Sequence, residues 1–122
     1  MAGAANVSTS LTVTGLGASR TQDNSFAATV PTAVTSQYLV QTTTDVGELL
    51  PLGDVSIVEG VLITAVTNDA YIDTTFDTDF SNEIELAEGK SCYFKPGGAV
   101  YFINKTANPA VVTLDYTVFG TV

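Results

Sequence analysis

Apolar and polar residues alternate along much of the chain after residue 36, with the period of two that is typical of β-strands. The run Glu83-Ile84-Glu85-Leu86 is the clearest case, because its carboxylates would face water and its aliphatic side chains the interior. Residues 57–66 carry apolar side chains at both alternating sets of positions, so we expect a central strand there, covered on both faces. The pattern predicts further strands at residues 37–41, 71–72, 92–94, 99–103 and 111–119.

Turn-forming residues separate these strands at intervals of about eight to twelve positions, and no helical period is present. Turns are expected at Asn68-Asp69 and Asn108-Pro109, and loops at residues 47–54 and 73–82. Many short strands joined in this way are typical of sandwiches and barrels. The pattern therefore predicts an all-β protein with a single β-sandwich, jelly-roll or Ig-like, over residues 36–122.

The first 35 residues are mostly Ala, Ser, Thr and Gly, and Arg20 and Asp23 are their only charged side chains. A segment with so few large side chains cannot form a core of its own. From Val7 to Val13 the pattern nevertheless alternates, as it would in a strand added to another sheet. We expect residues 1–35 to form an extended N-terminal arm that orders against its own domain, a sister subunit or a different protein. A disordered tail, or the first edge strand of the same fold, is the alternative.

The tripeptide Gly89-Lys90-Ser91 matches the end of the phosphate-binding motif G-x-x-x-x-G-K-S/T. Ile84 stands where the motif needs its first glycine, and a strand follows where a helix N-terminus should face the phosphate. Three nearby glutamates would also repel an anion. We therefore interpret residues 88–90 as a tight turn in which Gly89 has a positive φ.

A second turn is expected at Lys95-Pro96-Gly97-Gly98, where the proline presets φ and Gly97 accepts a positive φ. Together with the turn at residues 88–90, it would join three consecutive strands into a meander from Glu83 to Asn104. Both glycine-containing segments then have a structural explanation, and we expect no nucleotide site.

The chain has 122 residues and a net charge of -9, with four basic and thirteen acidic side chains. This length suits one domain with a single core, and the acidic balance disfavours a nucleic-acid partner. One cysteine and no histidine exclude an internal disulfide and remove the commonest general base. No apolar run is long enough for a membrane helix, and the N-terminus lacks the pattern of a signal peptide. We therefore expect synthesis in a cytoplasm, with no membrane partner.

Acidic residues gather between positions 69 and 88, with no basic residue among them. From Asp77 the spacing is similar to that of a calcium loop, with Asp79 and Ser81 next and Glu88 at the twelfth position. Strands are expected on both sides where a calcium-binding EF-hand has helices, so a solvated acidic loop is the alternative. Asp77 and Asp79 could also act as a glycosidase-type carboxylate pair, but the chain has no Trp for sugar stacking.

Several other side chains have a plain structural explanation. Cys92 lies on an apolar strand face without a histidine to activate it, which is typical of a core cysteine. Tyr71, Tyr93 and Tyr101 could form a binding stripe, although strand tyrosines commonly pack in cross-strand pairs. Phe119 shares a strand face with two threonines and is a candidate contact outside the core. We expect no catalytic residue, no cofactor, no metal ligand and no enzyme activity.

Five segments carry a resemblance to a known group of proteins. They are Glu48-Leu49-Leu50-Pro51-Leu52-Gly53-Asp54, Gly60-Val61-Leu62-Ile63-Thr64-Ala65-Val66-Thr67-Asn68-Asp69, Ile84-Glu85-Leu86, Lys95-Pro96-Gly97-Gly98-Ala99-Val100-Tyr101-Phe102 and Val112-Thr113-Leu114-Asp115-Tyr116. This succession of turns and strands resembles the small β-sandwich virion proteins of tailed bacteriophages, particularly capsid decoration or cement proteins. It covers roughly the last two-thirds of the chain, and it offers no catalytic residues to transfer.

The resemblance implies a jelly-roll or Ig-like domain on the capsid surface, commonly in a symmetric oligomer, with an arm that grips the shell. Residues 1–35 would be the arm, and the major capsid protein of a phage would be the partner. The first hypothesis is therefore a non-enzymatic cement protein that bridges shell subunits, with the arm lying across a capsid protein or adding a strand to it. The alternatives are a component of a phage neck, tail or fibre, and a calcium- or carbohydrate-binding β module.

Overall fold

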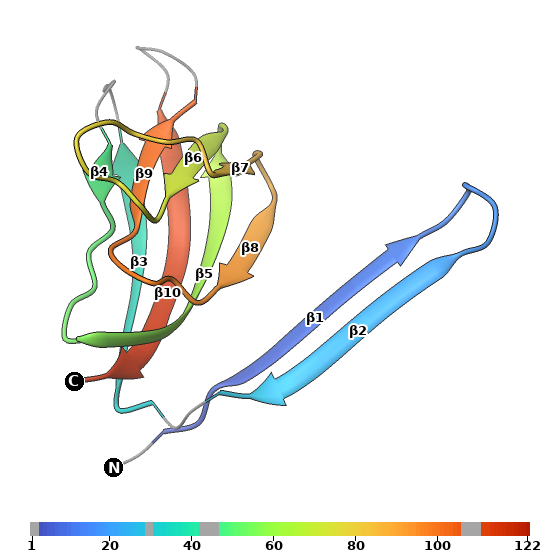
Figure 1. The fold of residues 1–122 in the computed structure, drawn as a ribbon, viewed down its shortest axis with the longest axis horizontal. Coiled ribbons are helices and arrows are strands. Elements are labelled where there is room, and N and C mark those ends of the chain that lie inside the picture. The colour runs from blue at the N-terminus through green and yellow to red at the C-terminus, as the bar shows by residue number, and fades with distance from the viewer. Residues whose placement is uncertain (1–2, 29–30, 42–46, 106–110) are drawn as a thin grey trace.

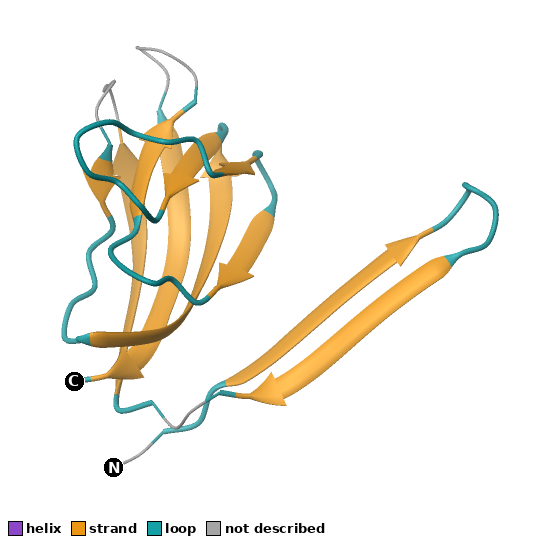
Figure 2. Ribbon diagram, in the orientation of Figure 1, coloured by secondary structure: helices purple, strands orange, loops and turns teal. Residues whose placement is uncertain are grey.

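The computed structural model describes residues 3–28, 31–41, 47–105 and 111–122. These residues form strands, turns and loops without any helix, so the all-β prediction is confirmed (Figure 2). The strands are β1 (Asn6–Val13), β2 (Arg20–Ala27), β3 (Ala33–Gln41), β4 (Glu48–Leu49), β5 (Ile57–Thr67), β6 (Ala70–Asp73), β7 (Ile84–Leu86), β8 (Ser91–Phe94), β9 (Tyr101–Asn104) and β10 (Val112–Thr121).

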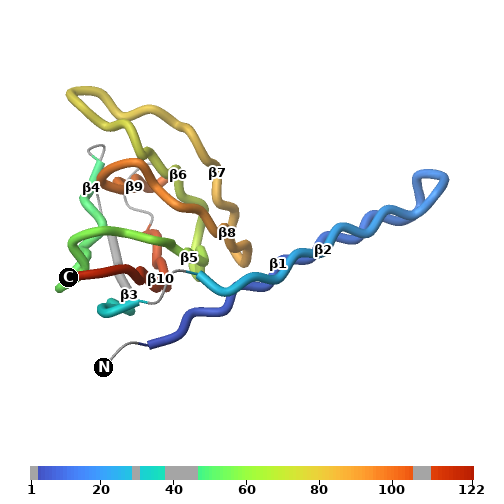
Figure 3. Tube along the Cα trace, turned by 60° about the horizontal axis from the view of Figure 1, so that its bottom comes forward, coloured from blue at the N-terminus to red at the C-terminus, as the bar shows by residue number. Residues whose placement is uncertain are grey.

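Eight of these strands form two four-stranded antiparallel sheets, whereas β1 and β2 form a hairpin of their own. The strand order is β3-β10-β5-β8 in the first sheet and β4-β9-β6-β7 in the second. The two sheets face each other, and the hairpin extends away from them (Figures 1 and 3). The arrangement of the sheets is consistent with the β-sandwich that the sequence pattern predicts.

The hydrophobic core fills the space between the two sheets. The alternation of β10 shows how it is built, because every second residue from Val112 to Val118 is buried and the residues between them face outward. The hydroxyl of Tyr116 donates a hydrogen bond to the carbonyl oxygen of Pro51 (2.7 Å), so the polar atom of this core residue is satisfied. The buried core residues are Leu50, Val55, Val61, Ile63, Ala65, Ala70, Ile72, Leu86, Val100, Phe102, Val112, Leu114, Tyr116 and Val118.

The expectation that both faces of residues 57–66 are covered is wrong. One face of β5 packs into the core, but Leu62 and Val66 point outward and remain 47% and 39% exposed. β5 is an inner strand of the first sheet, as expected, yet in the described part of the chain these two side chains on the sheet's outer face stay open to solvent. The second set of apolar residues on this strand therefore forms part of an exposed surface rather than of a second core.

The meander predicted from Glu83 to Asn104 is also wrong, because consecutive strands enter different sheets. β7 pairs with β6 in the second sheet, β8 pairs with β5 in the first, and β9 returns to the second between β4 and β6. The chain makes these crossings because each strand turns its apolar side toward the shared core, which two facing sheets supply and one meander does not.

The turn at residues 88–90 is as predicted, with a φ of 80° at Gly89 and a hydrogen bond from the Lys90 N–H to the Ala87 carbonyl oxygen (2.9 Å). The prediction for Gly97 is wrong, since its φ is not positive. Its segment is a longer connection from one sheet to the other, so no tight turn requires that conformation.

The remaining boundaries follow the pattern closely. Asn68 has a φ of 61° in the turn between β5 and β6, a conformation that asparagine tolerates better than most residues. The two-residue strand β4 lies inside the predicted loop 47–54, and β3 begins at Ala33, three residues before the expected start of the sandwich. The predicted turn at Asn108-Pro109 lies outside the described residues.

Candidate interaction surface

The hairpin has one face that carries its apolar side chains. In the register of β1 and β2, Val7 pairs with Phe26, Leu11 with Gln22, and Val13 with Arg20. The two residues of a pair in an antiparallel hairpin project to the same side, and successive pairs along the hairpin alternate between the two sides. Val7, Leu11, Val13 and Phe26 therefore share what we call the apolar face of the hairpin, together with the single cationic side chain, Arg20.

The opposite, polar face of the hairpin is a ladder of cross-strand hydrogen bonds. The hydroxyls of Ser8 and Ser25 lie 3.1 Å apart, and the Ser10 hydroxyl donates to the Asp23 carboxylate (2.6 Å). These bonds hold the register of the two strands and satisfy their polar groups. The polar face thus provides local order, whereas the apolar face has no comparable function within the hairpin.

The apolar face and the hairpin tip are open to solvent. Leu11 is 58% exposed, Phe26 is 40% exposed, and Leu16 at the tip is 86% exposed. Positive φ angles at Gly15 (83°) and Gly17 (99°) shape the tip loop and hold Leu16 between them. A two-stranded hairpin is marginally stable by itself in water, and exposed apolar patches commonly mark sites of association.

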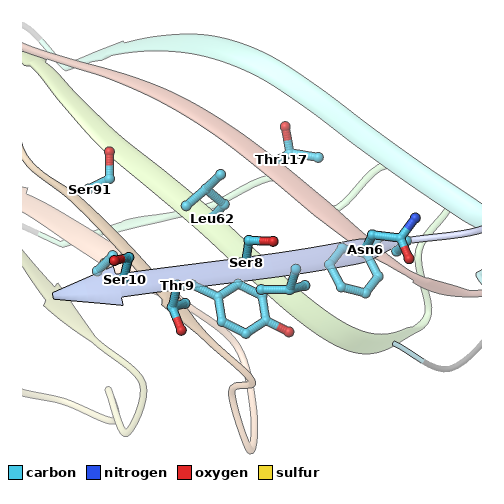
Figure 4. A pocket seen from close by; sticks show the side chains of 12 residues that line it. Asn6, Ser8, Thr9, Ser10, Leu62, Ser91 and Thr117 are labelled. Atoms are coloured by element: carbon cyan, nitrogen blue, oxygen red, sulfur yellow. The ribbon is translucent and has the colours of Figure 1, made fainter. Parts of the chain in front are cut away.

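A groove of about 620 Å³ separates the base of β1 from the outer face of the first sheet. Asn6, Ser8 and Ser10 from β1 lie along one side, and residues such as Leu62 and Thr117 lie across from them (Figure 4). The groove is open, and none of the described side chains that line it is charged.

Two aromatic residues connect the hairpin base with the first sheet. The rings of Phe26 and Tyr93 have centroids 6.1 Å apart, within the range of aromatic pairs. Phe119 lies on the outer face of the first sheet and outside the core cluster, as predicted, but it is only 9% exposed. Phe119 lines the groove beside the hairpin base, so residues of its own chain already shield most of this side chain from a partner.

The residues of the predicted calcium loop are not brought together. Asp77 and Asp79 are exposed in the loop between β6 and β7, whereas Glu88 lies beyond β7 and accepts a hydrogen bond from the Asn68 N–H (2.7 Å). Among the described residues, no group of three acidic or thiol side chains could hold a metal ion. The strand β7 separates the two halves of the motif, which a helix-loop-helix calcium loop would keep together.

A buried carboxylate, Asp73, organises this loop, and the pattern of the sequence did not single it out. Its side chain accepts hydrogen bonds from the N–H groups of Thr75 and Ser81, both at 2.8 Å, and from the Thr75 hydroxyl at 3.1 Å. Burial raises the pKa of Asp73, but the hydrogen bonds outweigh it and hold that pKa below its ordinary value. Asp73 has no exposed surface.

Contacts within the fold account for the Gly89-Lys90-Ser91 segment and for Lys105. The Ser91 hydroxyl lies 2.7 Å from the Thr64 hydroxyl on the neighbouring strand, and Ser91 begins β8 rather than a helix. A hydrogen bond with Glu85 raises the pKa of Lys105, whose ammonium also lies 5.8 Å from the centre of the Tyr71 ring.

The remaining candidates are dispersed over the two sheets. By their strand registers, Tyr71 and Tyr101 project from the outer face of the second sheet and Tyr93 from that of the first, so the three do not form one stripe. Cys92 packs against the core, and burial raises the pKa of its thiol. These candidates therefore form no common site among the described residues, whereas the hairpin presents an extended apolar surface.

Comparisons with protein-family models, curated proteins and solved structures gave no match. In the described part of the chain, no helix is long and apolar enough to cross a membrane.

Proposed function

We propose that this chain is a non-enzymatic structural protein of a bacteriophage virion, and that it decorates and stabilises the capsid. The observation that carries the proposal is the hairpin of residues 6–27, which projects from the domain with an exposed apolar face. An element of this kind suits a protein whose task is to hold neighbouring subunits together. The likeness of residues 48–116 to small phage β-sandwich proteins suggests the setting.

We infer further that the two sheets form a jelly roll rather than an Ig-like sandwich. The strands pair as if one long hairpin were folded over, with β3 beside β10, β4 beside β9, β5 beside β8 and β6 beside β7. Nested pairing of eight strands, divided between two sheets of four, supports this assignment. Jelly rolls are common in viral capsid proteins, which is in keeping with the proposed setting.

In this proposal each copy contributes a compact domain and a projecting link. The domain rests on the shell formed by the major capsid protein, and the hairpin reaches a neighbouring subunit. Each contact is small, but a shell carries many identical copies, so weak contacts add up to strong attachment. The net charge of -9 favours a place on the outer, solvent-facing surface rather than beside packaged nucleic acid.

Copy number in purified particles tests this proposal. Quantitative mass spectrometry of virions from the source virus would compare this chain with the major capsid protein. An equal or simple fractional ratio supports decoration of the whole shell, because symmetric shells repeat their subunits in fixed proportions. Only a few copies per particle would move the protein to a neck, tail or fibre, and its absence from particles would refute the virion proposal.

A further inference from the structure

We propose that the apolar face of the hairpin binds the first sheet of a second copy of this chain. The receiving surface consists of outward-facing side chains on β5 and β10, and we call it the outer sheet face: Leu62, which also lines the groove, and Thr64, Val66 and Asp115, which do not. The inference concerns the protein alone in solution, so it does not depend on a place in a virion.

Both surfaces expose apolar side chains, although Phe26 at the hairpin base already contacts Tyr93 of the first sheet in the same chain. Leu11 on the hairpin is 58% exposed, while Leu62 and Val66 on the outer sheet face are 47% and 39% exposed. The outer half of the hairpin points away from its own sheets, as two views show (Figures 1 and 3). A contact between two copies would therefore bury both exposed apolar patches.

The two surfaces also carry charges in matching positions. On the hairpin, Arg20 is diagonal to Leu11, because Arg20 pairs with Val13, two residues further along β1. On the outer sheet face, Asp115 is diagonal to Leu62, because Asp115 pairs with Thr64, two residues further along β5. Diagonal neighbours in antiparallel sheets lie about 7–8 Å apart. When Leu11 contacts Leu62, this equal spacing can bring Arg20 to Asp115.

Neither charged residue forms an ion pair with a described residue of its own chain. Arg20 and Asp115 take part in none of the ion pairs of the described residues, and both are exposed. A contact between copies would therefore add an ion pair without breaking an existing one. Opposite charges at matching positions favour one register of the two surfaces over others.

The distribution of charge singles out the hairpin as the part that can approach another copy. Residues 1–35 contain one Arg and one Asp, so the remainder of the chain carries the whole net charge of -9. Two such domains repel each other, whereas a neutral hairpin brings no net charge to the second domain.

The first experiment measures self-association of the full chain by sedimentation velocity at micromolar to millimolar concentrations. We expect an oligomer whose dissociation constant rises at least about tenfold in Leu11→Asp and in Leu62→Asp, because each variant places a carboxylate in the apolar contact. The matched control is Thr12→Asp, which adds the same charge one residue away on the polar face. It should associate like the unchanged chain, and thermal melting of each variant verifies that the domain is folded.

A charge exchange tests the register. Arg20→Glu and Asp115→Arg should each weaken association, and the chain carrying both changes should recover to within about threefold of the original dissociation constant. A monomer at the highest concentration overturns the proposal. An oligomer that responds equally to Leu11→Asp and Thr12→Asp also overturns it, since the apolar face would then not be the contact. Failure of the double exchange to recover association rules out the pairing of Arg20 with Asp115.

Discussion

The buried carboxylate of Asp73 gives the sharpest test of how the loop of residues 74–83 is held. Replacing it with asparagine keeps the volume and shape of the side chain but removes the charge and one acceptor oxygen. The amide can accept a hydrogen bond from Thr75 or from Ser81, but its NH₂ group must then face the other N–H. Asp73→Asn thus breaks one charge-assisted bond, weakens a second and leaves donors facing each other.

The loss of stability in Asp73→Asn follows from these contacts. A hydrogen bond to a charged group contributes about 1.5–3 kcal/mol, and an unsatisfied buried donor costs about 1–3 kcal/mol. Asparagine retains one acceptor oxygen, so part of this hydrogen bonding remains and the total loss is smaller than the sum. We therefore expect Asp73→Asn to lower the free energy of unfolding by about 2–3 kcal/mol, equivalent to a fall in Tm of about 10 °C for a domain of this size.

Urea unfolding followed by circular dichroism measures this loss, and Asp79→Asn is the matched control. Asp79 lies in the same loop but is exposed, so its substitution should change the free energy of unfolding by less than about 0.5 kcal/mol. Equal effects of the two substitutions would refute the reasoning, because they would show that the buried hydrogen bonds of Asp73 add nothing beyond the loss of a negative charge.

The pH dependence provides a second readout of the same carboxylate. The folded-state pKa of Asp73 is lower than its ordinary value of 3.8, so the unfolded state binds the proton more readily. The stabilisation is therefore complete above the ordinary pKa and is lost as the pH falls through the lower, folded-state pKa. The stability difference between the original chain and Asp73→Asn should stay constant from neutral pH to about pH 5 and shrink below about pH 4.

Three further changes test other parts of the fold. A Cβ at Gly120 would overlap the Ile57 carbonyl oxygen, so Gly120→Ala should lower the free energy of unfolding in urea by at least about 3 kcal/mol. The control Gly97→Ala has open space around the new Cβ and should lower it by less than about 1 kcal/mol. Similar values for both substitutions would contradict the close approach of β10 to β5. Tyr116→Phe removes the hydrogen bond to Pro51 and should lower the free energy of unfolding by about 1 kcal/mol, and an unchanged value would mean that this bond adds no net stability. Because burial raises the pKa of the Cys92 thiol, a disulfide reagent at neutral pH should react much more slowly with the folded chain than with the chain in urea, and equal rates would place that thiol outside the core.

Local alternation in the sequence predicted most strands but could not predict their partners. The run from Glu83 to Leu86 alternates within a few residues, so its strand could be identified without knowledge of the rest of the chain. Its sheet depends on β6, and β10 pairs with residues 33–41 and 57–67, which come far earlier in the chain. Pairing over such distances leaves no periodic signal, which is why a meander was expected where the chain crosses between sheets.

The sequence pattern predicted neither the β1–β2 hairpin nor the role of the buried Asp73, and the reasons differ. Residues 20–27 are exposed throughout and therefore show no alternation, so the first 35 residues suggested an extended arm rather than a hairpin. The glycines at positions 15 and 17 were the available signal for the reversal. Asp73 was one acid among many, but the sequence Asp73-Thr74-Thr75 fits an Asx turn, in which an aspartate accepts the N–H two residues on.

The position of β10 imposes an order on how this protein can be made. β10 comes last of the ten strands in the chain, yet it lies between β3 and β5 in the first sheet. That sheet cannot close on the ribosome before residues 112–121 have emerged, and domains dominated by such distant pairings fold in about milliseconds to seconds. The hairpin of β1 and β2 pairs neighbouring residues and can form in about 1–10 μs, while synthesis of the rest continues. Each nascent chain therefore presents its hairpin before its own outer sheet face exists, and in the proposed contact that hairpin can be received only by a copy whose first sheet has already closed.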